Sequence, residues 1–257
     1  MLKSRTDSGS EAKGTRGKKA GFTLAEVLIT LGIIGVVAAM TIPNLISNYS
    51  KHIVESNLKE TYSILQQTLK FTEYDDVSFE MELPDNMESS KKWFETYLAP
   101  HMKYSTVCYN KSGCWNDKGL TRTLSGGVPY TYRSQIGIGS DIIIIKLTNG
   151  SNLIVDGYSA GSIYNYFGVK ISDPSSIILF IDGNGDRPPN IIGQDIYAAV
   201  FTSDGVVPAG NSMTNEDVNK NCSKLTSGNN AGYFCLTRVK NNGWEIPSDV
   251  WRMKVKR

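Results

Sequence analysis

The sequence lacks most of the residue patterns on which enzymes depend. It contains only two histidines, His52 and His101, and neither stands at ligand spacing for a zinc site. It also has no glycine-rich phosphate loop of recognised spacing, no GxSxG and no HExxH. These absences argue against an enzyme, so we predict no catalytic residue.

Cysteine is scarce as well. The chain has four cysteines, none of them in a CxxC pair: Cys108, Cys114, Cys222 and Cys235. Two short-range disulfides, Cys108–Cys114 and Cys222–Cys235, are the simplest arrangement for a domain exported to an oxidising compartment. The other two pairings remain open, as does a cytosolic protein with four reduced thiols.

Positive charge in excess is confined to the N-terminus. Residues 1–21 contain six Lys or Arg against Asp7 and Glu11, a charge of +4, so the net charge of +2 leaves −2 for all later residues. Apart from the terminal RMKVKR there is no stripe of Lys and Arg. Nucleic acid is therefore not indicated as a partner.

A long apolar run follows this basic segment, from Phe22 to Ile42. Its interruptions are Thr23, Glu26, Thr30 and Thr41. At 1.5 Å per helical residue the run is long enough to cross a hydrocarbon core of roughly 30 Å. The basic residues before it would hold the N-terminus in the cytoplasm and send the rest of the chain outward.

Glu26 is unusual in such a run, because an acid deep in lipid costs roughly 2.5 to 3.5 kcal/mol. A secretory signal peptide cleaved near Val36–Met40 is one interpretation of the segment. A plain signal anchor, which tolerates Glu26 near the interface, is another.

A third interpretation is a resemblance. The stretch KKAG followed by FTLAEVLITLGIIGVVAAMTIPNL resembles the N-terminus of the type IV prepilin and pseudopilin family. Residues that match in order are Gly21, Phe22, Thr23, Leu24 and Glu26, and Pro43 stands where that family bends its helix. The resemblance reaches to about Ser50.

The resemblance implies that a prepilin peptidase cleaves between Gly21 and Phe22 and methylates the new amino group of Phe22. It also implies that Glu26 pairs with the N-terminus of the next subunit as that subunit joins a filament. The implied partners are membrane lipid before assembly, an inner-membrane assembly platform, an assembly ATPase and other pilin or pseudopilin subunits. The protein would cross the inner membrane once, then enter a periplasmic or cell-surface filament.

Three parts follow along the chain: a basic leader (1–21), an N-terminal helix (22–71) and an extracytoplasmic globular domain (72–257). Within the helix, Leu58, Tyr62, Leu65 and Leu69 recur with the period of a buried stripe. We expect one helix through Pro43, although two separate helices remain an alternative. Lys51, Glu55, Lys59 and Glu60 are expected on its other faces.

The globular part has the pattern of an antiparallel sheet. Two β-branched runs flank Asn149–Gly150 and predict a hairpin, and further strands are expected at Ser176–Asp182 and after Asp195, with a turn at Asp204–Gly205. Residues 89–102 predict a short helix capped by a serine, and residues 210–230 a surface loop. The fold class is therefore α+β, a long helix packed on an antiparallel sheet, as in pilins.

One loop is rich in acids and amides. Its candidate ligands are Asp182, Asn184, Asp186 and Asp195. Such oxygens suit calcium, although the loop is not an EF-hand because Gly193 stands where the twelfth-position Glu would be. Some pseudopilins bind calcium in a loop near the end of their sheet. The alternative is an ion-free turn stiffened by Pro188 and Pro189.

We therefore expect a structural subunit of a type IV pilus or a type II secretion pseudopilus. The alternative is a single-pass, membrane-anchored binding protein that does not polymerise. The sequence leaves open whether a filament would serve adhesion, motility, secretion or DNA uptake.

Overall fold

The computed structural model describes residues 21–74, 86–109, 114–115, 121–129, 142–202, 205–223 and 225–255, with the side chains of 72–74 left aside. The predicted leader up to residue 20 and Asp204 of the predicted turn lie outside these residues. The chain divides into two compact units at the junction of Ile46 and Ser47, and each is described by itself.

Helix α1 spans Leu24–Tyr74 as one continuous helix that contains Pro43. The prediction of a single helix is confirmed, and the helix ends three residues later than Phe71. A bend at Pro43 stays a prediction.

Within the first unit, α1 presents apolar side chains to the surroundings. By length and composition, α1 is long and apolar enough to cross a membrane. The Thr30 hydroxyl donates a hydrogen bond to the Glu26 carbonyl (2.9 Å), and the Thr41 hydroxyl donates one to the Val37 carbonyl (3.0 Å). The hydroxyl groups of both threonines are thus hydrogen-bonded within the helix. They leave no unpaired donor that would disfavour placing the helix in lipid.

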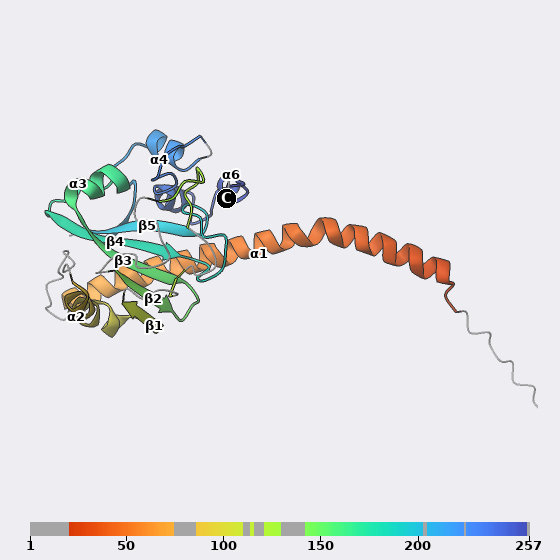
Figure 1. Ribbon diagram of the computed structural model, residues 1–257, viewed down its shortest axis with the longest axis horizontal. Helices are drawn as coiled ribbons and strands as arrows, with labels where there is room; N and C mark the ends of the chain where they lie inside the picture. The colour runs from red at the N-terminus through yellow and green to blue at the C-terminus, as the bar shows by residue number, and fades with distance from the viewer. Residues whose placement is uncertain are drawn as a thin grey trace, which may run out of the picture. The chain divides into compact units, whose positions relative to one another are not determined.

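The second unit is built on a six-stranded antiparallel sheet whose strands follow chain order. The strands are β1 (Tyr104–Tyr109), β2 (Ile143–Leu147), β3 (Asn152–Ser159), β4 (Ser175–Asp182), β5 (Ile196–Thr202) and β6 (Gly205–Pro208). Figure 1 shows β1 to β5 side by side, with the later part of α1 running across one face. The β2–β3 hairpin turns at Asn149–Gly150 as predicted, whereas β1 was not predicted.

Both faces of this sheet are buried. On β3, Leu153 and Val155 join the core cluster that includes α1, whereas Ile154 joins a second cluster on the opposite face. The same alternation continues on β4 with Leu179 and Phe180. Strands buried on both faces need no polar alternation, which explains the nearly continuous apolar runs in these two strands.

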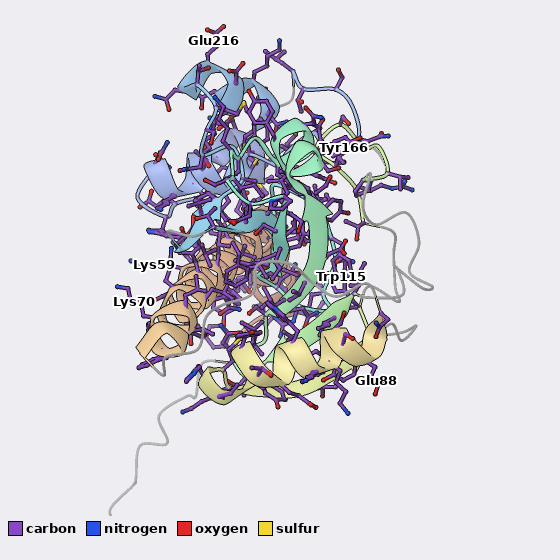
Figure 2. The ribbon with its side chains drawn as sticks, turned by 90° about the vertical axis from the view of Figure 1, so that its left-hand side faces the viewer. Lys59, Lys70, Glu88, Trp115, Tyr166 and Glu216 are labelled. Atoms are coloured by element: carbon purple, nitrogen blue, oxygen red, sulfur yellow. A yellow bond between two sulfur atoms is a disulfide. The ribbon has the colours of Figure 1, made fainter. Side chains whose placement is uncertain are left out.

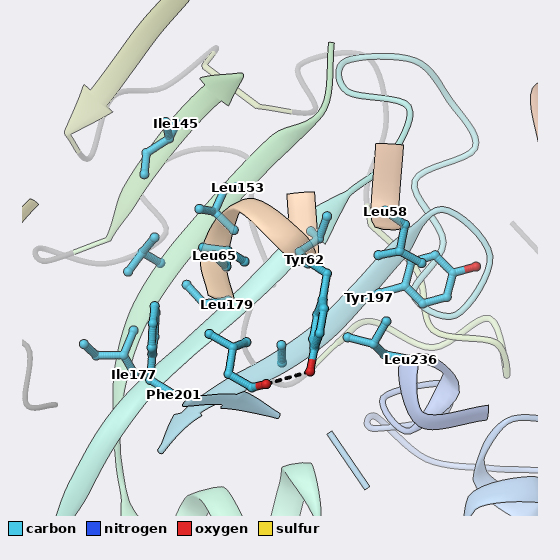
Figure 3. Packing of buried hydrophobic residues seen from close by; sticks show 14 of the residues in the cluster. Leu58, Tyr62, Leu65, Ile145, Leu153, Ile177, Leu179, Tyr197, Phe201 and Leu236 are labelled. Atoms are coloured by element: carbon cyan, nitrogen blue, oxygen red, sulfur yellow. Dashed lines mark hydrogen bonds between the residues drawn. The ribbon is translucent and has the colours of Figure 1, made fainter. Parts of the chain in front are cut away.

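The stripe predicted on α1 packs on the first of these faces, where Leu58 and Leu65 are fully buried (Figure 3). Tyr62 is buried with them, and its hydroxyl donates a hydrogen bond of 2.6 Å to the Val206 carbonyl. Lys59 and Lys70 extend from α1 into solvent (Figure 2). The amphipathic pattern therefore identifies the sheet-facing side of the helix.

On the opposite face the core is aromatic. The rings of Phe167 and Tyr233 stack at a centroid distance of 5.1 Å, and Phe180 of β4 meets Tyr233 edge to face at 5.7 Å. Phe167 ends a short helical segment, α3 (Ala160–Ser162) followed by η2 (Ile163–Phe167), that links β3 to β4. The sheet is thus the middle layer of the unit.

Short helices complete the unit: α2 (Met87–Tyr97), η1 (Ala99–His101), α4 (Asn215–Asn221), α5 (Cys235–Asn241) and α6 (Ser248–Trp251). Helix α2 begins at Met87 and is capped by Asn86, whose side chain accepts from the Ser89 amide, so the expected serine cap is wrong. Helix α4 lies within the segment expected to be a surface loop. Its Thr214 cap and the acids after it are the signal that sequence reasoning missed.

The structure contains both disulfides that the sequence favoured. Cys108 and Cys114 are joined with Cα atoms 6.3 Å apart, and Cys222 and Cys235 with Cα atoms 4.9 Å apart. The second bond links the end of α4 to the start of α5. The first ends next to Trp115, a buried residue that reaches the β4–β5 loop.

Candidate functional site: the N-terminal motif and the β4–β5 loop

Thr23 and Glu26 form a reciprocal cap at the start of α1. The Thr23 amide and hydroxyl each donate a hydrogen bond of 2.8 Å to Glu26 Oε2, and the Glu26 amide donates one of 3.2 Å to Thr23 Oγ1. This is a capping box, which sequence reasoning missed although Thr-x-x-Glu is its pattern. Glu26 is therefore hydrogen-bonded within its own chain.

Gly21 and Phe22 lie in the open just before this cap. Phe22 is 89 % exposed, and a Cβ added at Gly21 would meet no atom within 4 Å. Packing in the described structure therefore does not require glycine at position 21.

The helix beyond the cap offers an apolar surface that its own unit does not cover. The large apolar side chains from Leu24 to Ile46 that are most exposed include Leu24, Ile29, Ile34, Met40 and Leu45. An exposed apolar surface of this length needs lipid or other helices around it.

Glu55 contrasts with Glu26. It is 9 % exposed, accepts a hydrogen bond of 2.7 Å from the Ile246 amide, and lies 3.2 Å from Lys51 Nζ and 3.1 Å from His52 Nδ1. The expectation that Glu55 lies on a polar outer face is therefore wrong. This acid continues the buried stripe and ties α1 to the segment before α6.

The β4–β5 loop places two acids in the interior. Asp182 ends β4 and Asp195 precedes β5, and both are fully buried. Trp115 Nε1 donates a hydrogen bond of 2.7 Å to Asp182 Oδ2. The amides of Asn190 and Ile191 donate to the Asp195 carboxylate at 2.8 Å and 2.6 Å.

The structure brings together three of the four ligands predicted for calcium. Asn184 Nδ2 donates to Asp195 Oδ2 at 3.0 Å, and the charge of Asp195 acts on Asp182. Asp186 instead receives hydrogen bonds from Lys146 Nζ (2.6 Å) and from the Asn152 side chain. It neutralises a lysine of β2 rather than joining the buried group.

Burial perturbs both interior acids. It raises the pKa of Asp195 to about 7, although the hydrogen bonds from the loop amides act to lower that pKa. Burial first, and the charge of Asp195 second, raise the pKa of Asp182 well above its usual range. Among the described residues, no group of three or more His, Cys, Asp and Glu is placed to hold a metal ion.

Two family models match the chain. The prokaryotic N-terminal methylation motif matches residues 16–42, and a family of unknown function (DUF6613) matches residues 44–171. A search of curated proteins and a search of solved structures found no match. The first model covers the predicted cleavage position and Glu26, and the second ends before the β4–β5 loop. The methylation motif is the signature of type IV prepilins and pseudopilins, and residues 16–42 of this chain carry it.

Proposed function

We propose that the protein is a structural subunit of a type IV pilus or a type II secretion pseudopilus. The observation that carries the proposal is the methylation motif, which ends in a helix whose apolar side chains are exposed from Leu24 to Ile46. A globular unit with its own core follows that helix. One chain thus combines a segment that needs neighbours with a domain that does not.

Processing would begin with cleavage between Gly21 and Phe22 by a prepilin peptidase, followed by methylation of the Phe22 amino group. Cleavage converts the Phe22 amide into a cationic amine at the start of α1. This charge is unfavourable in hydrocarbon and at the positive end of a helix dipole. A carboxylate in reach of that amine removes both penalties.

Glu26 is the acid that would provide the countercharge. Before assembly its carboxylate is held by Thr23 at the first turn of α1, so it is already directed toward the helix start. As a subunit enters the filament, Glu26 would pair with the methylated N-terminus of a neighbouring subunit. Pairing of two charges in an apolar environment favours the register in which both are satisfied.

The proposed location and partners follow from this route. The chain would insert once into the inner membrane with its globular domain outside the cytoplasm. An assembly platform and an assembly ATPase would then transfer it from lipid into a periplasmic or cell-surface filament. Helices of other pilin or pseudopilin subunits would replace lipid around the exposed face of α1.

The test is intact-mass and N-terminal peptide analysis of the protein produced together with its native peptidase. We expect a chain that begins at Phe22 and carries one added methyl group. A Gly21→Leu variant is the matched control, because nothing packs against position 21 and only processing should fail. Cleavage near Ala39 would indicate a secreted protein, and an uncut wild type beside an active peptidase would indicate an anchored binding protein.

A further inference from the structure

The last part of the chain runs back along α1 toward the first residues of the globular unit. Three contacts, each with an earlier position of α1, define its path: Trp244 with Tyr62 (ring centroids 5.1 Å apart), the Ile246 amide with Glu55 (2.7 Å) and Trp251 Nε1 with Ser47 Oγ (3.0 Å). Trp251, which ends α6 (Figure 1), also donates from its ring nitrogen to the Ser47 carbonyl at 3.2 Å. The end of the chain is therefore held at Ser47, where this unit begins.

Beyond α6 the chain alternates between the core and solvent. Its apolar residues pack against the core cluster that includes α1: Trp251, Met253 and Val255. The basic residues between them, Arg252 and Lys254, are exposed. The buried Gln194 side chain fixes this arrangement, because its amide donates hydrogen bonds of 2.8 Å to the carbonyls of Val250 and Met253. The tail therefore presents its positive charges outward from an anchored backbone.

Arg187 of the β4–β5 loop brings a third exposed cation to the same place. It lines a pocket of about 270 Å³ together with Ser47, Ser50 and Trp251. A guanidinium beside hydroxyl groups suits a phosphate, since Arg can contact two phosphate oxygens at once and a hydroxyl can donate a further hydrogen bond. Trp251 connects the pocket to the tail, and together they form what we call the basal surface: Arg187, Trp251, Arg252 and Lys254.

Nearby acids do not cancel the charge of the basal surface. Within the described part of the chain, no ion pair involves any of its three cations. Acids that are close to it along the chain have other partners: Asp186 pairs with Lys146, Asp249 with Arg238 and Glu55 with Lys51. Asp182 and Asp195 are fully buried, and neither lines the pocket. Glu245 is exposed but lies farther along α1, because its neighbour Ile246 contacts Glu55.

The basal surface is tied to the point at which the apolar stretch of α1 ends, since Ser47 directly follows Ile46. The headgroup layer of a bilayer is roughly 5 to 7 Å thick on each side of the hydrocarbon core. Four helical residues rise about 6 Å. In a chain inserted through its apolar stretch, Ser47 and Ser50 would therefore lie among lipid headgroups. Tryptophan is enriched in the same layer, which suits Trp251 as well.

We propose that the basal surface binds the headgroups of anionic phospholipids in the leaflet from which the globular unit emerges. Arg187 contacts a lipid phosphate at the pocket, and Arg252 and Lys254 are attracted by the negative charge of the leaflet. This role rests on the proposed insertion of α1 in a membrane, and not on assembly into a filament. Its consequence is to hold the globular unit against the membrane until α1 leaves the lipid.

The test uses the full chain in detergent. Native mass spectrometry compares its binding of phosphatidylglycerol, which is anionic, with that of phosphatidylcholine carrying the same acyl chains. Because α1 contacts the acyl chains of both lipids alike, the ratio of the two affinities reports headgroup recognition. We expect phosphatidylglycerol to bind more tightly by about fivefold or more, the effect of one basic residue at an anionic surface. Equal affinities would overturn the proposal and would leave an acidic face of a partner protein as the occupant.

Charge-removing variants locate the headgroup site, since the basic leader contributes equally to all of them. Arg187→Gln should lower the preference for phosphatidylglycerol by about fivefold, and Arg252→Gln combined with Lys254→Gln should lower it further. Lys59→Gln combined with Lys70→Gln is the matched control, because it removes two charges from exposed positions farther along α1 (Figure 2). The control should keep the preference of the wild type. A loss in the control as large as in the tail variant would overturn the proposal.

Lipid preference and N-terminal processing are separate readouts. Headgroup binding requires neither cleavage after Gly21 nor a filament. An uncut chain that still prefers phosphatidylglycerol through the basal surface would contradict the filament and support the lipid site. A chain that begins at Phe22 but binds both lipids equally would support the processing route and overturn the lipid site.

Discussion

Between Leu24 and Ile46, helix α1 exposes its apolar side chains on nearly every side, whereas between Ser47 and Phe71 the same helix buries a single stripe against a sheet. Secondary structure does not distinguish the two stretches, because both are parts of one continuous helix. What distinguishes the two stretches is the distribution of apolar residues around the helix. The second stretch is stabilised by its own chain, and the first needs surroundings that the chain does not supply.

Two glutamates sharpen the comparison. Glu26 is exposed and its carboxylate accepts hydrogen bonds from Thr23 at the helix start, whereas Glu55 is buried and its carboxylate accepts from the Ile246 amide. The same side chain therefore serves the interior of the fold at one position and lies exposed at the start of the helix at the other.

The largest expected effect comes from Glu26→Ala, which should abolish incorporation into filaments because the neighbouring N-terminus loses its countercharge. Unfolding of the globular unit should not change. Glu55→Ala is the matched control: it should lower the free energy of unfolding by about 1 to 3 kcal/mol, since the Ile246 amide loses its acceptor. Sheared-filament yield and urea unfolding measure the two effects. Normal filament yield from Glu26→Ala would contradict the assigned role.

A leucine pair tests the same contrast in packing. Leu65 is fully buried, whereas Leu28 is 61 % exposed. Leu65→Ala should lower the free energy of unfolding of the globular unit by about 2 to 5 kcal/mol. Leu28→Ala should leave it unchanged in detergent. If both variants lost similar stability in urea titrations, the division of the helix into two differently stabilised stretches would be wrong.

Buried acids distinguish the units further, since the acids fully buried in the described chain belong to the globular unit. The pKa of Asp195 is raised to about 7, so the folded state holds this proton more tightly than the unfolded chain. The contribution to stability is present at low pH and is lost as pH rises through about 7. Metal-free protein should therefore lose on the order of a few kcal/mol between pH 5 and pH 8.

Urea unfolding across this pH range, with a chelator present, measures the loss. Asp195→Asn is the control, because it removes one of the two titrating acids and should make the profile shallower, while the raised pKa of Asp182 leaves a residual slope of the same sign. Stability that rises from pH 5 to pH 8 in the wild type would contradict the raised pKa of Asp195.

Local patterns predicted much of this fold. The stripe through Leu58 and Leu65, the hairpin at Asn149–Gly150 and the runs of β4 and β5 each follow from periodicity or turn chemistry over a few residues. Strand β1 was missed because only Cys108 of its six residues is buried, and an edge strand pairs through its backbone rather than through an apolar pattern.

The sequence predicted the residues of the N-terminal motif more completely than those of the β4–β5 loop, and the reason is physical. The N-terminal motif is contiguous, so its residues were recognised together and the methylation model matches them. In the β4–β5 loop the role of each residue depends on contacts from elsewhere. Lys146 of β2 forms an ion pair with Asp186. Trp115, which follows Cys114 of the first disulfide, donates a hydrogen bond to Asp182. Asn190 carries no sequence signal, because only the turn of the loop brings it to Asp195.

The smallest expected effect comes from removing one of two helix caps of the same kind. Thr214 caps α4 as Thr23 caps α1, since the Thr214 hydroxyl contacts Asp217 Oδ2 at 2.7 Å and accepts from the Asp217 amide at 3.1 Å. Thr214→Ala should cost about 1 kcal/mol in urea unfolding of the globular unit. Thr23→Ala should cost that unit nothing, because its loss frays only the first turn of a helix that other molecules must surround. Equal losses from the two variants would mean that the N-terminal stretch contributes to the fold of the domain, and the contrast between the two parts of α1 would then fail.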